Sequence, residues 1–133
     1  MVDISNLSGY TWSNKTIVIA EDEESNFRFL EMVLVRTGVK ILWAFDGLEA
    51  IELVKSNRPD LVLMDIKMPN LDGLEATRRL KSLYPEIPIV MQTAYAMSSD
   101  EKQSYEAGCD AYISKPIRAK KLIEVVARFL EKN

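Results

Sequence analysis

The sequence predicts an α/β domain built on a parallel β-sheet, and three observations support this prediction. Short apolar runs alternate along the chain with longer segments of helical period, which is the pattern of successive βα units. The apolar runs are nearly continuous, as in strands whose two faces are both covered by helices. At 133 residues, the chain fits one domain, because domains most often contain about 100 to 150 residues.

Five apolar runs mark the expected strands. They cover residues 16–20, 39–44, 61–64, 89–92 and 111–114. Lys40 interrupts the second run, so we expect this strand at an edge of the sheet. The other runs are not interrupted by charge, and each leads directly to polar residues.

Two of the five expected helices carry a start signal. Asp46 with Glu49, and Asp72 with Glu75, resemble capping boxes. In such a box the first side chain accepts a hydrogen bond from a free helix amide, and the glutamate reaches back toward the chain before the helix. A glycine directly follows each aspartate, so these helices are expected to begin there.

The last two helices are indicated by an end signal and by a periodic apolar stripe. Gly108 is placed to end the helix that begins near Ser98, because glycine readily adopts the left-handed conformation found after helices. The final helix carries apolar residues at i, i+3, i+4, i+7 and i+8, which form a stripe facing the core. These residues are Leu122, Val125, Val126, Phe129 and Leu130.

The amino-terminal residues differ in composition from the rest of the chain. Residues 1–14 are mostly polar, include Gly9, Ser13 and Asn14, and show no sustained period. We therefore assign residues 1–14 to a linker or tail and residues 15–133 to the domain.

Charge and hydropathy exclude several classes of protein. The net charge of -3 and the pI near 5.1 give no electrostatic footprint for direct nucleic-acid binding. No apolar run approaches the roughly 18 residues that span a bilayer, and the amino end does not resemble a secretory signal. We therefore expect a cytoplasmic or cytosol-facing domain that makes no membrane contact.

The cysteine and histidine counts narrow the chemistry further. Cys109 is the single cysteine, which excludes an internal disulfide and fits a reducing compartment. Histidine is absent from the sequence. A histidine triad, a histidine metal ligand and a phosphohistidine on this chain are therefore all excluded.

Polar residues stand at the carboxyl ends of four expected strands. They are Glu21, Asp22, Asp65, Thr93 and Lys115. Open α/β sheets bind ligands at this edge. Three clustered acids repel one another, and a divalent cation relieves that repulsion. Oxygen ligands favour Mg²⁺ or Mn²⁺ over zinc, so the set predicts a magnesium-assisted phosphoryl site.

Each of these residues also has a simpler explanation when taken alone. The acids that follow Asp22 are typical of a helix start, where they stabilise the helix dipole. Asp65 can belong to an ordinary strand-to-helix turn, and Lys115 can be an exposed lysine before a turn proline. The joint arrangement of Asp65, Thr93 and Lys115 favours the phosphoryl site.

The order and spacing of these motifs resemble the receiver domain of two-component response regulators. The matching segments are IAED at residues 19–22, LVLMDIKMP at 61–69, DG at 72–73, TA at 93–94 and KP at 115–116. The likeness runs from about Lys15 to Asn133. It implies a flavodoxin-like, doubly wound sheet of five parallel strands in the order 2-1-3-4-5, with five helices.

The resemblance assigns a role to each residue of the site. Asp65 is expected to be the phosphoacceptor, and Lys115 is expected to pair with a phosphoryl oxygen. Asp22 and Asp65 are expected to bind Mg²⁺ directly, Glu21 through water, and Lys67 through its backbone carbonyl. Many relatives have aspartate at the position of Glu21, so the longer side chain departs from the usual pattern.

The resemblance also implies switch and tuning residues. Thr93 is expected to donate a hydrogen bond to the phosphoryl group, after which the Tyr112 ring turns into the vacated space. Simple half-buried packing is the alternative explanation for Tyr112. Lys67 and Tyr95 are bulky at the two positions that control water access, which predicts a long-lived aspartyl phosphate.

The residues favour one kind of protein as the source of this domain but leave a second kind open. The motifs look most like receivers at the carboxyl ends of hybrid sensor histidine kinases, and a freestanding single-domain response regulator is the alternative. Expected partners are a histidine kinase or a histidine phosphotransfer domain, with a phosphorylation-dependent homodimer as a further expectation.

Two functions from other classes stay open. A phosphatase with Asp65 as nucleophile normally has a second acid two residues later, where this chain has Lys67. A binding module that does not accept phosphoryl groups is disfavoured by the intact Asp65, Thr93 and Lys115.

Overall fold

The computed structural model, described here for residues 9–93 and 98–131, contains a five-stranded parallel sheet with the strand order β2-β1-β3-β4-β5. This order confirms the flavodoxin-like topology expected from the resemblance. The strands are β1 (Thr16–Ala20), β2 (Lys40–Ala44), β3 (Leu61–Asp65), β4 (Ile89–Thr93) and β5 (Ala111–Ser114).

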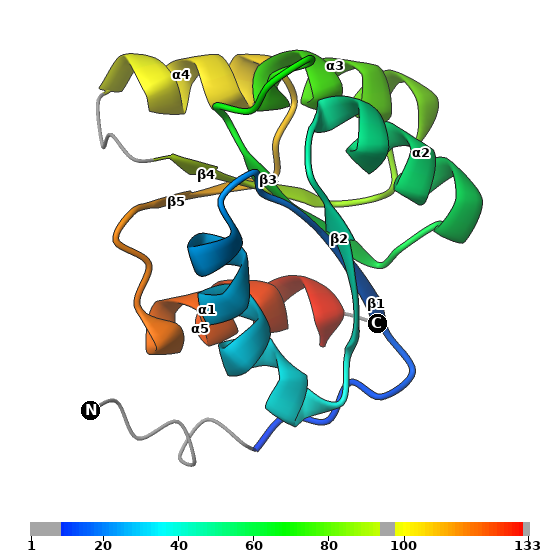
Figure 1. The fold of residues 1–133 in the computed structure, drawn as a ribbon, viewed down its shortest axis with the longest axis vertical. Helices are drawn as coiled ribbons and strands as arrows, with labels where there is room; N and C mark the ends of the chain where they lie inside the picture. Colours follow the sequence, from blue (N-terminus) through cyan, green and yellow to red (C-terminus); the bar gives the residue numbers. More distant parts are fainter. Residues whose placement is uncertain (1–8, 94–97, 132–133) are drawn as a thin grey trace.

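Helices cover both faces of the sheet. In Figure 1, α1 and α5 lie on one face, and α2, α3 and α4 lie on the other. The helices are α1 (Glu24–Leu34), η2 (Val35–Thr37, a 3-10 turn), α2 (Gly47–Asn57), α3 (Gly73–Leu83), α4 (Ser98–Glu106) and α5 (Ala119–Leu130). Among the described residues, no helix combines the length and apolar character needed to cross a membrane.

The strand side chains divide between two cores because successive residues of a strand point to opposite faces. Ile17 and Ile19 of β1 pack into the core beneath α1 and α5, whereas Val18 packs into the core beneath α2 and α3. The same division separates Leu63 from Met64 in β3. All four aliphatic residues of the predicted β3 run are buried, as a central parallel strand requires.

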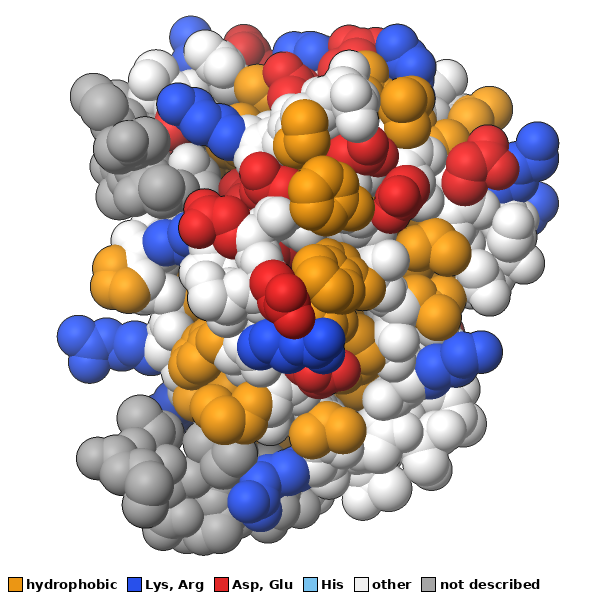
Figure 2. All heavy atoms as spheres, viewed as in Figure 1, with side chains coloured by type: hydrophobic (Ala, Val, Ile, Leu, Met, Phe, Trp, Pro, Cys, Tyr) orange, Lys and Arg blue, Asp and Glu red, His pale blue; other side chains and the backbone are white. Residues whose placement is uncertain are grey.

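The second strand lies at an edge of the sheet, as Lys40 predicts. The ring of Trp43 in this strand stacks on Phe27 of α1, with ring centroids 4.3 Å apart. Phe45 and Leu48 follow the strand and remain about half exposed. Figure 2 shows hydrophobic side chains gathered over β2 and the start of α2.

The capping boxes form only in part. Asp46 and Asp72 accept the expected hydrogen bonds from the amides of Glu49 and Glu75. Glu49 does reach back, but it accepts from the amide of Phe45, one residue earlier than a capping box requires. The Glu75 side chain instead turns forward to Arg78 and Arg79, where two ion pairs hold it. Electrostatic attraction to two arginines explains this difference.

The later helix signals are confirmed. Gly108 follows α4 with a φ of +107°, a backbone conformation that favours glycine, and its amide bonds to the carbonyl of Tyr105. In α5, the predicted stripe faces the core, with Phe129 only partly buried and the other members buried.

Part of the segment predicted as a linker or tail packs on the domain. The Trp12 side chain is buried, and its indole nitrogen donates to Glu131 Oε2 at 2.6 Å. The Trp12 amide also bonds to the carbonyl of Thr37. These contacts join the approach to β1 to the end of α5, so residues near the predicted boundary contribute to the core.

Candidate functional site

The parallel strands bring the predicted site residues to one edge of the sheet. Asp65 and Thr93 are the last residues of β3 and β4, Glu21 directly follows β1, and Lys115 directly follows β5. Backbone hydrogen bonds continue past the strand ends and hold these positions in register. The amide of Glu21 bonds to Ala44, and the amide of Lys115 bonds to Thr93 at 2.7 Å.

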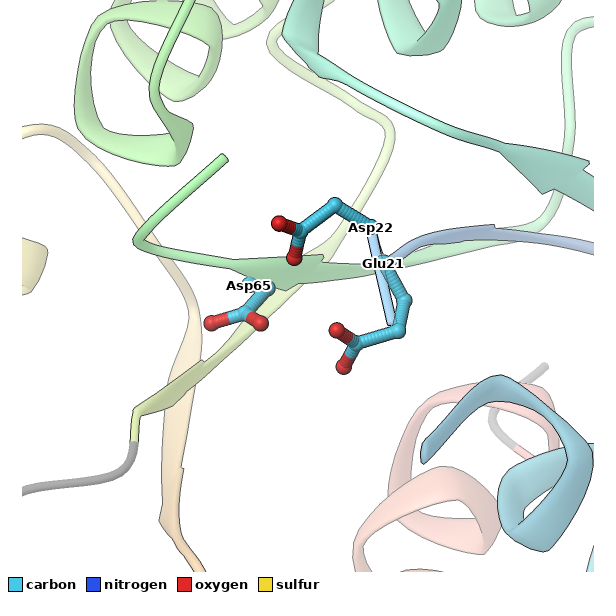
Figure 3. Close-up of side chains that lie close together, drawn as sticks. All are labelled: Glu21, Asp22 and Asp65. Carbon is cyan, nitrogen blue, oxygen red and sulfur yellow. The ribbon is translucent and has the colours of Figure 1, made fainter. Parts of the chain in front are cut away.

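Three carboxylates converge at this edge. Figure 3 shows Glu21, Asp22 and Asp65 gathered where β1 and β3 end. One carboxylate oxygen from each residue lies within 4.8 Å of the others, a spacing that suits a single divalent cation. Glu21 and Asp65 are buried and Asp22 is partly exposed, so the cluster opens to solvent on one side. This all-oxygen set fits Mg²⁺ or Mn²⁺.

Lys115 balances part of the negative charge. Its ammonium lies 3.0 Å from Asp65 Oδ2 and 3.3 Å from Glu21 Oε1. Burial by itself lowers the pKa of Lys115, but hydrogen bonds and attraction to Asp65 and Glu21 outweigh it, and the net pKa is raised. Lys115 therefore stays a cation beside the two carboxylates.

Of the three carboxylates, Glu21 has a clearly raised pKa, so its ionised form is disfavoured in the cluster. Burial and repulsion from Asp65 raise the pKa of its carboxyl to about 7, despite the opposing attraction of Lys115. Glu21 Oε2 also accepts a hydrogen bond from the amide of Glu23 at 3.2 Å. The ionised cluster is therefore unfavourable by itself and gains from a bound cation.

A glycine allows the helix after β3 to approach the acceptor strand. A Cβ atom on Gly73, the first residue of α3, would overlap the carbonyl oxygen of Asp65. The Gly73 amide also bonds to the carbonyl of Ile66 at 2.7 Å. Because only glycine fits this contact, the Asp72-Gly73 pair fixes both the start of α3 and the backbone of Asp65.

The predicted switch and tuning residues are placed as follows. Thr93 is buried, and its hydroxyl donates to Asp100 Oδ2 of α4 at 3.2 Å. Tyr112 is half buried on the edge strand β5. Lys67 is exposed two residues beyond Asp65. Tyr95 lies outside the described residues.

Most of the chain matches a known protein family. The sequence model of the response regulator receiver domain family matches residues 17–127. This chain belongs to the response regulator receiver domain family. Receiver domains act in two-component signalling with histidine kinases or phosphotransfer partners.

Curated relatives are similar over nearly their whole length. The polar-differentiation response regulator DivK of Brucella anthropi is 40% identical over 118 residues, which cover 87% of this chain and 96% of that protein. DivK of Brucella ovis is 39% identical over the same shares.

Solved receiver structures share the fold. A putative response regulator from Chloroflexus aurantiacus matches with a TM-score of 0.84 and 29% identity, over 89% of this chain and 98% of that one. The receiver domain of a Pseudomonas aeruginosa sensor histidine kinase matches with a TM-score of 0.83, 29% identity and the same coverage. That structure has a magnesium ion coordinated in its active-site cleft.

Two features of the site were not predicted from the sequence. One is the bond from Thr93 to Asp100, whose only sequence signal is an acid in the first turn of α4. The other is Gln92, which is buried, and no described residue forms a hydrogen bond with its Nε2 atom. The only indication in the sequence is that Gln92 is the one polar residue in the otherwise apolar run 89–92. Gln92 lines a cavity of about 300 Å³ between α1 and the segment after β5.

Proposed function

We propose that this receiver domain accepts a phosphoryl group on Asp65 from a phosphohistidine, in a reaction that depends on Mg²⁺. The observation that carries the proposal is the placement of Asp65 between a lysine ammonium, 3.0 Å from its Oδ2 atom, and two further carboxylates. A nucleophilic carboxylate, a fixed cation and a metal-binding set are the parts that phosphoryl transfer requires.

The proposed transfer uses one Asp65 oxygen as nucleophile. This oxygen attacks phosphorus in line as the bond to the imidazole nitrogen breaks, and the electron pair of that bond stays with the imidazole. The product is an acyl phosphate on Asp65. Lys115 gives up its contact with the free carboxylate and pairs with a phosphoryl oxygen, which holds the group beside the acceptor.

The resemblance implies the residues that would bind the metal. Asp22 and Asp65 would bind Mg²⁺ directly, Glu21 would bind through water, and Lys67 would contribute its backbone carbonyl. The bound cation would neutralise charge on the phosphoryl oxygens. The three clustered carboxylates and the magnesium site of the Pseudomonas aeruginosa receiver support this assignment.

The output of the reaction is a change in a surface that a partner binds. Thr93 would donate to the new phosphoryl group, and Tyr112 would respond from β5. Lys67 and Tyr95 would slow hydrolysis by limiting access of water. Replacing both with small residues tests this last role, and an unchanged hydrolysis rate would contradict it.

Whether this domain belongs to a larger hybrid histidine kinase stays a prediction. That prediction rests on the likeness of its motifs to those of hybrid-kinase receivers. The alternative, a regulator without an attached kinase, is favoured by the DivK relatives, 96% of whose length this chain covers. In either setting, we propose that a histidine kinase or a phosphotransfer domain supplies the phosphoryl group in the cytoplasm.

Intact-mass spectrometry after incubation with acetyl phosphate and Mg²⁺ tests the function. The native chain should gain one phosphoryl group, and Asp65→Asn should gain none. Asp72→Asn is the matched control, because asparagine preserves the helix cap at Asp72 while removing a nearby acid. Equal labelling of Asp65→Asn and the native chain would overturn the proposal, and turnover of phosphomonoesters would favour the phosphatase.

A further inference from the structure

The hydroxyl of Thr93 is held by an acid from another element. Thr93 Oγ1 donates to Asp100 Oδ2 at 3.2 Å, which joins the end of β4 to the first turn of α4. Thr93 is 3% exposed and Asp100 is partly exposed, so this bond is partly buried. A hydrogen bond to a carboxylate in such a setting is stronger than one between neutral groups.

The backbones on both sides of this bond are anchored. The carbonyl of Thr93 accepts from the amide of Lys115 at 2.7 Å, which fixes the end of β4 against β5. The carbonyl of Asp100 accepts from the hydroxyl of Ser104 at 2.8 Å, and Ser104 is fully buried. The Thr93 hydroxyl can therefore change partner mainly by rotation of its own side chain.

A threonine hydroxyl carries one proton, so it donates one strong hydrogen bond at a time. Donation to Asp100 excludes donation to a phosphoryl oxygen on Asp65. The two acceptors belong to different elements, because Asp100 lies in α4 and Asp65 ends the neighbouring strand β3. Capture of Thr93 by the phosphoryl group must therefore break its bond to α4.

Asp100 also acts electrostatically near Tyr112. Burial raises the pKa of Tyr112, and the negative charges of Asp100 and Glu101 raise it further. The half-buried Tyr112 packs against the core on the face that α4 covers (Figure 1). Asp100 thus lies within electrostatic range of the second residue expected to respond to phosphorylation.

We propose that Asp100 is a positioning residue that holds Thr93 away from the acceptor site and thereby opposes the phosphorylated conformation until the phosphoryl group competes for the hydroxyl. The inference rests on the proposed phosphorylation of Asp65. By linkage, the free energy of the Thr93–Asp100 bond is subtracted from the affinity of the site for a phosphoryl group. Breaking the bond also removes a link between β4 and α4, which couples the chemistry to a surface helix.

Beryllofluoride with Mg²⁺, a mimic of the phosphoryl group, provides the test. Asp100→Ala should bind it about fivefold more tightly than the native chain, as expected for loss of one competing hydrogen bond. Glu101→Gln is the matched control, because it removes one exposed charge from the same helix turn. Equal tightening in both variants would assign the effect to helix charge and overturn the proposal.

A double-mutant cycle separates positioning from general loosening of α4. In a Thr93→Val background the hydroxyl is gone, so Asp100→Ala should no longer change the affinity for beryllofluoride. An unchanged effect in that background would show that Asp100 acts without Thr93 and would overturn the inference.

A second measurement keeps the inference distinct from the proposed function. Three-bond NMR couplings of Thr93 in the unphosphorylated protein should report one side-chain rotamer in the native chain and averaging in Asp100→Ala. Averaging in the native chain would overturn the positioning role. A single rotamer in a native chain that binds no beryllofluoride would overturn the proposed phosphorylation, and with it the competition, while leaving the Thr93–Asp100 contact established.

Discussion

The ammonium of Lys115 lies 3.0 Å from Oδ2 of Asp65, although the two residues are 50 positions apart in the chain. Parallel pairing of β3, β4 and β5 produces this contact, because each strand delivers its carboxyl end to the same edge. Lys115 also contacts Glu21, a second carboxylate of the cluster, at 3.3 Å. One cation is thus shared between the proposed acceptor and a proposed metal-binding acid.

Replacing Lys115 with methionine should have opposite effects on metal binding and on phosphorylation. Mg²⁺ should bind more tightly, because the competing positive charge is gone from Asp65 and Glu21. Phosphorylation by acetyl phosphate should slow by about 100-fold, a typical cost of losing one charge-stabilising group. Calorimetric titration and a mass-spectrometric time course measure the two effects. Lys120→Met removes an exposed lysine as the control, and parallel changes in both quantities would contradict the prediction.

Replacing Glu21 with glutamine should stabilise the metal-free protein at pH 8. Because the pKa of Glu21 rises from 4.5 to about 7 on folding, folding favours its protonated form. This contribution to stability is fully present below pH 4.5 and is lost as the pH rises through 7. Glutamine imitates the protonated form at every pH. The raised pKa already includes the attraction of Lys115, so we expect a gain of about 3 kcal/mol at pH 8.

Denaturant unfolding in EDTA at pH 8 and at pH 4 measures this effect. The advantage of Glu21→Gln should be present at pH 8 and absent at pH 4. With Mg²⁺ added, the native chain should gain more stability than the variant, since a ligand stabilises the state that binds it. Glu106→Gln, an exposed change in α4, serves as the control. A variant less stable than the native chain at pH 8 would show that the Lys115 pair outweighs burial.

Replacing Gly73 with alanine should destabilise the protein by about 2 kcal/mol, even though alanine is the better helix former. The added methyl group would overlap the carbonyl oxygen of Asp65. Relief of that overlap must shift α3 or the end of β3, so phosphorylation should slow as well. Gly9→Ala is the control, because no atom in the described part of the chain lies within 4 Å of its added carbon. Thermal unfolding that matches the native chain would contradict this packing argument.

The parts of the site that follow from strand topology are predictable from the sequence, and the parts that depend on side-chain rotation are not. Apolar runs that end in Asp65, Thr93 and Lys115 place those residues together once the sheet is parallel. The start of α3 follows from the Asp72-Gly73 pair. By contrast, the bond from Thr93 to Asp100 depends on where α4 begins and how one side chain rotates.

The amino-terminal boundary shows a similar limit. Trp12 lies in a polar segment without periodicity, so its burial depends on a single residue reaching α5 and the turn after α1. Pattern arguments need several residues of one period, and a lone aromatic side chain supplies none.

The orientation of the Glu75 side chain could not be predicted from the capping-box pattern either, because two arginines compete with the backbone for its carboxylate.

Replacing Gln92 with methionine should stabilise the protein by about 1 kcal/mol. Gln92 is 2% exposed, and its Nε2 atom has no hydrogen-bond partner within residues 9–93 and 98–131. A buried amide that lost its water without gaining a partner costs free energy, and an unbranched apolar side chain of similar length avoids that cost. The aliphatic and ring atoms of Phe29, Leu30 and Ile117 line the same cavity and can pack against the methionine.

Urea unfolding of Gln92→Met, with exposed Gln103→Met as the control, measures this gain. The backbone carbonyl of Gln92 accepts from the amide of Ile66 and is kept in the variant, so the strand register beside Asp65 should persist. Phosphorylation of Gln92→Met by acetyl phosphate should therefore proceed at the native rate. A loss of stability would mean that the amide finds a partner in solution, and ordered water in the cavity would then be the group that satisfies it.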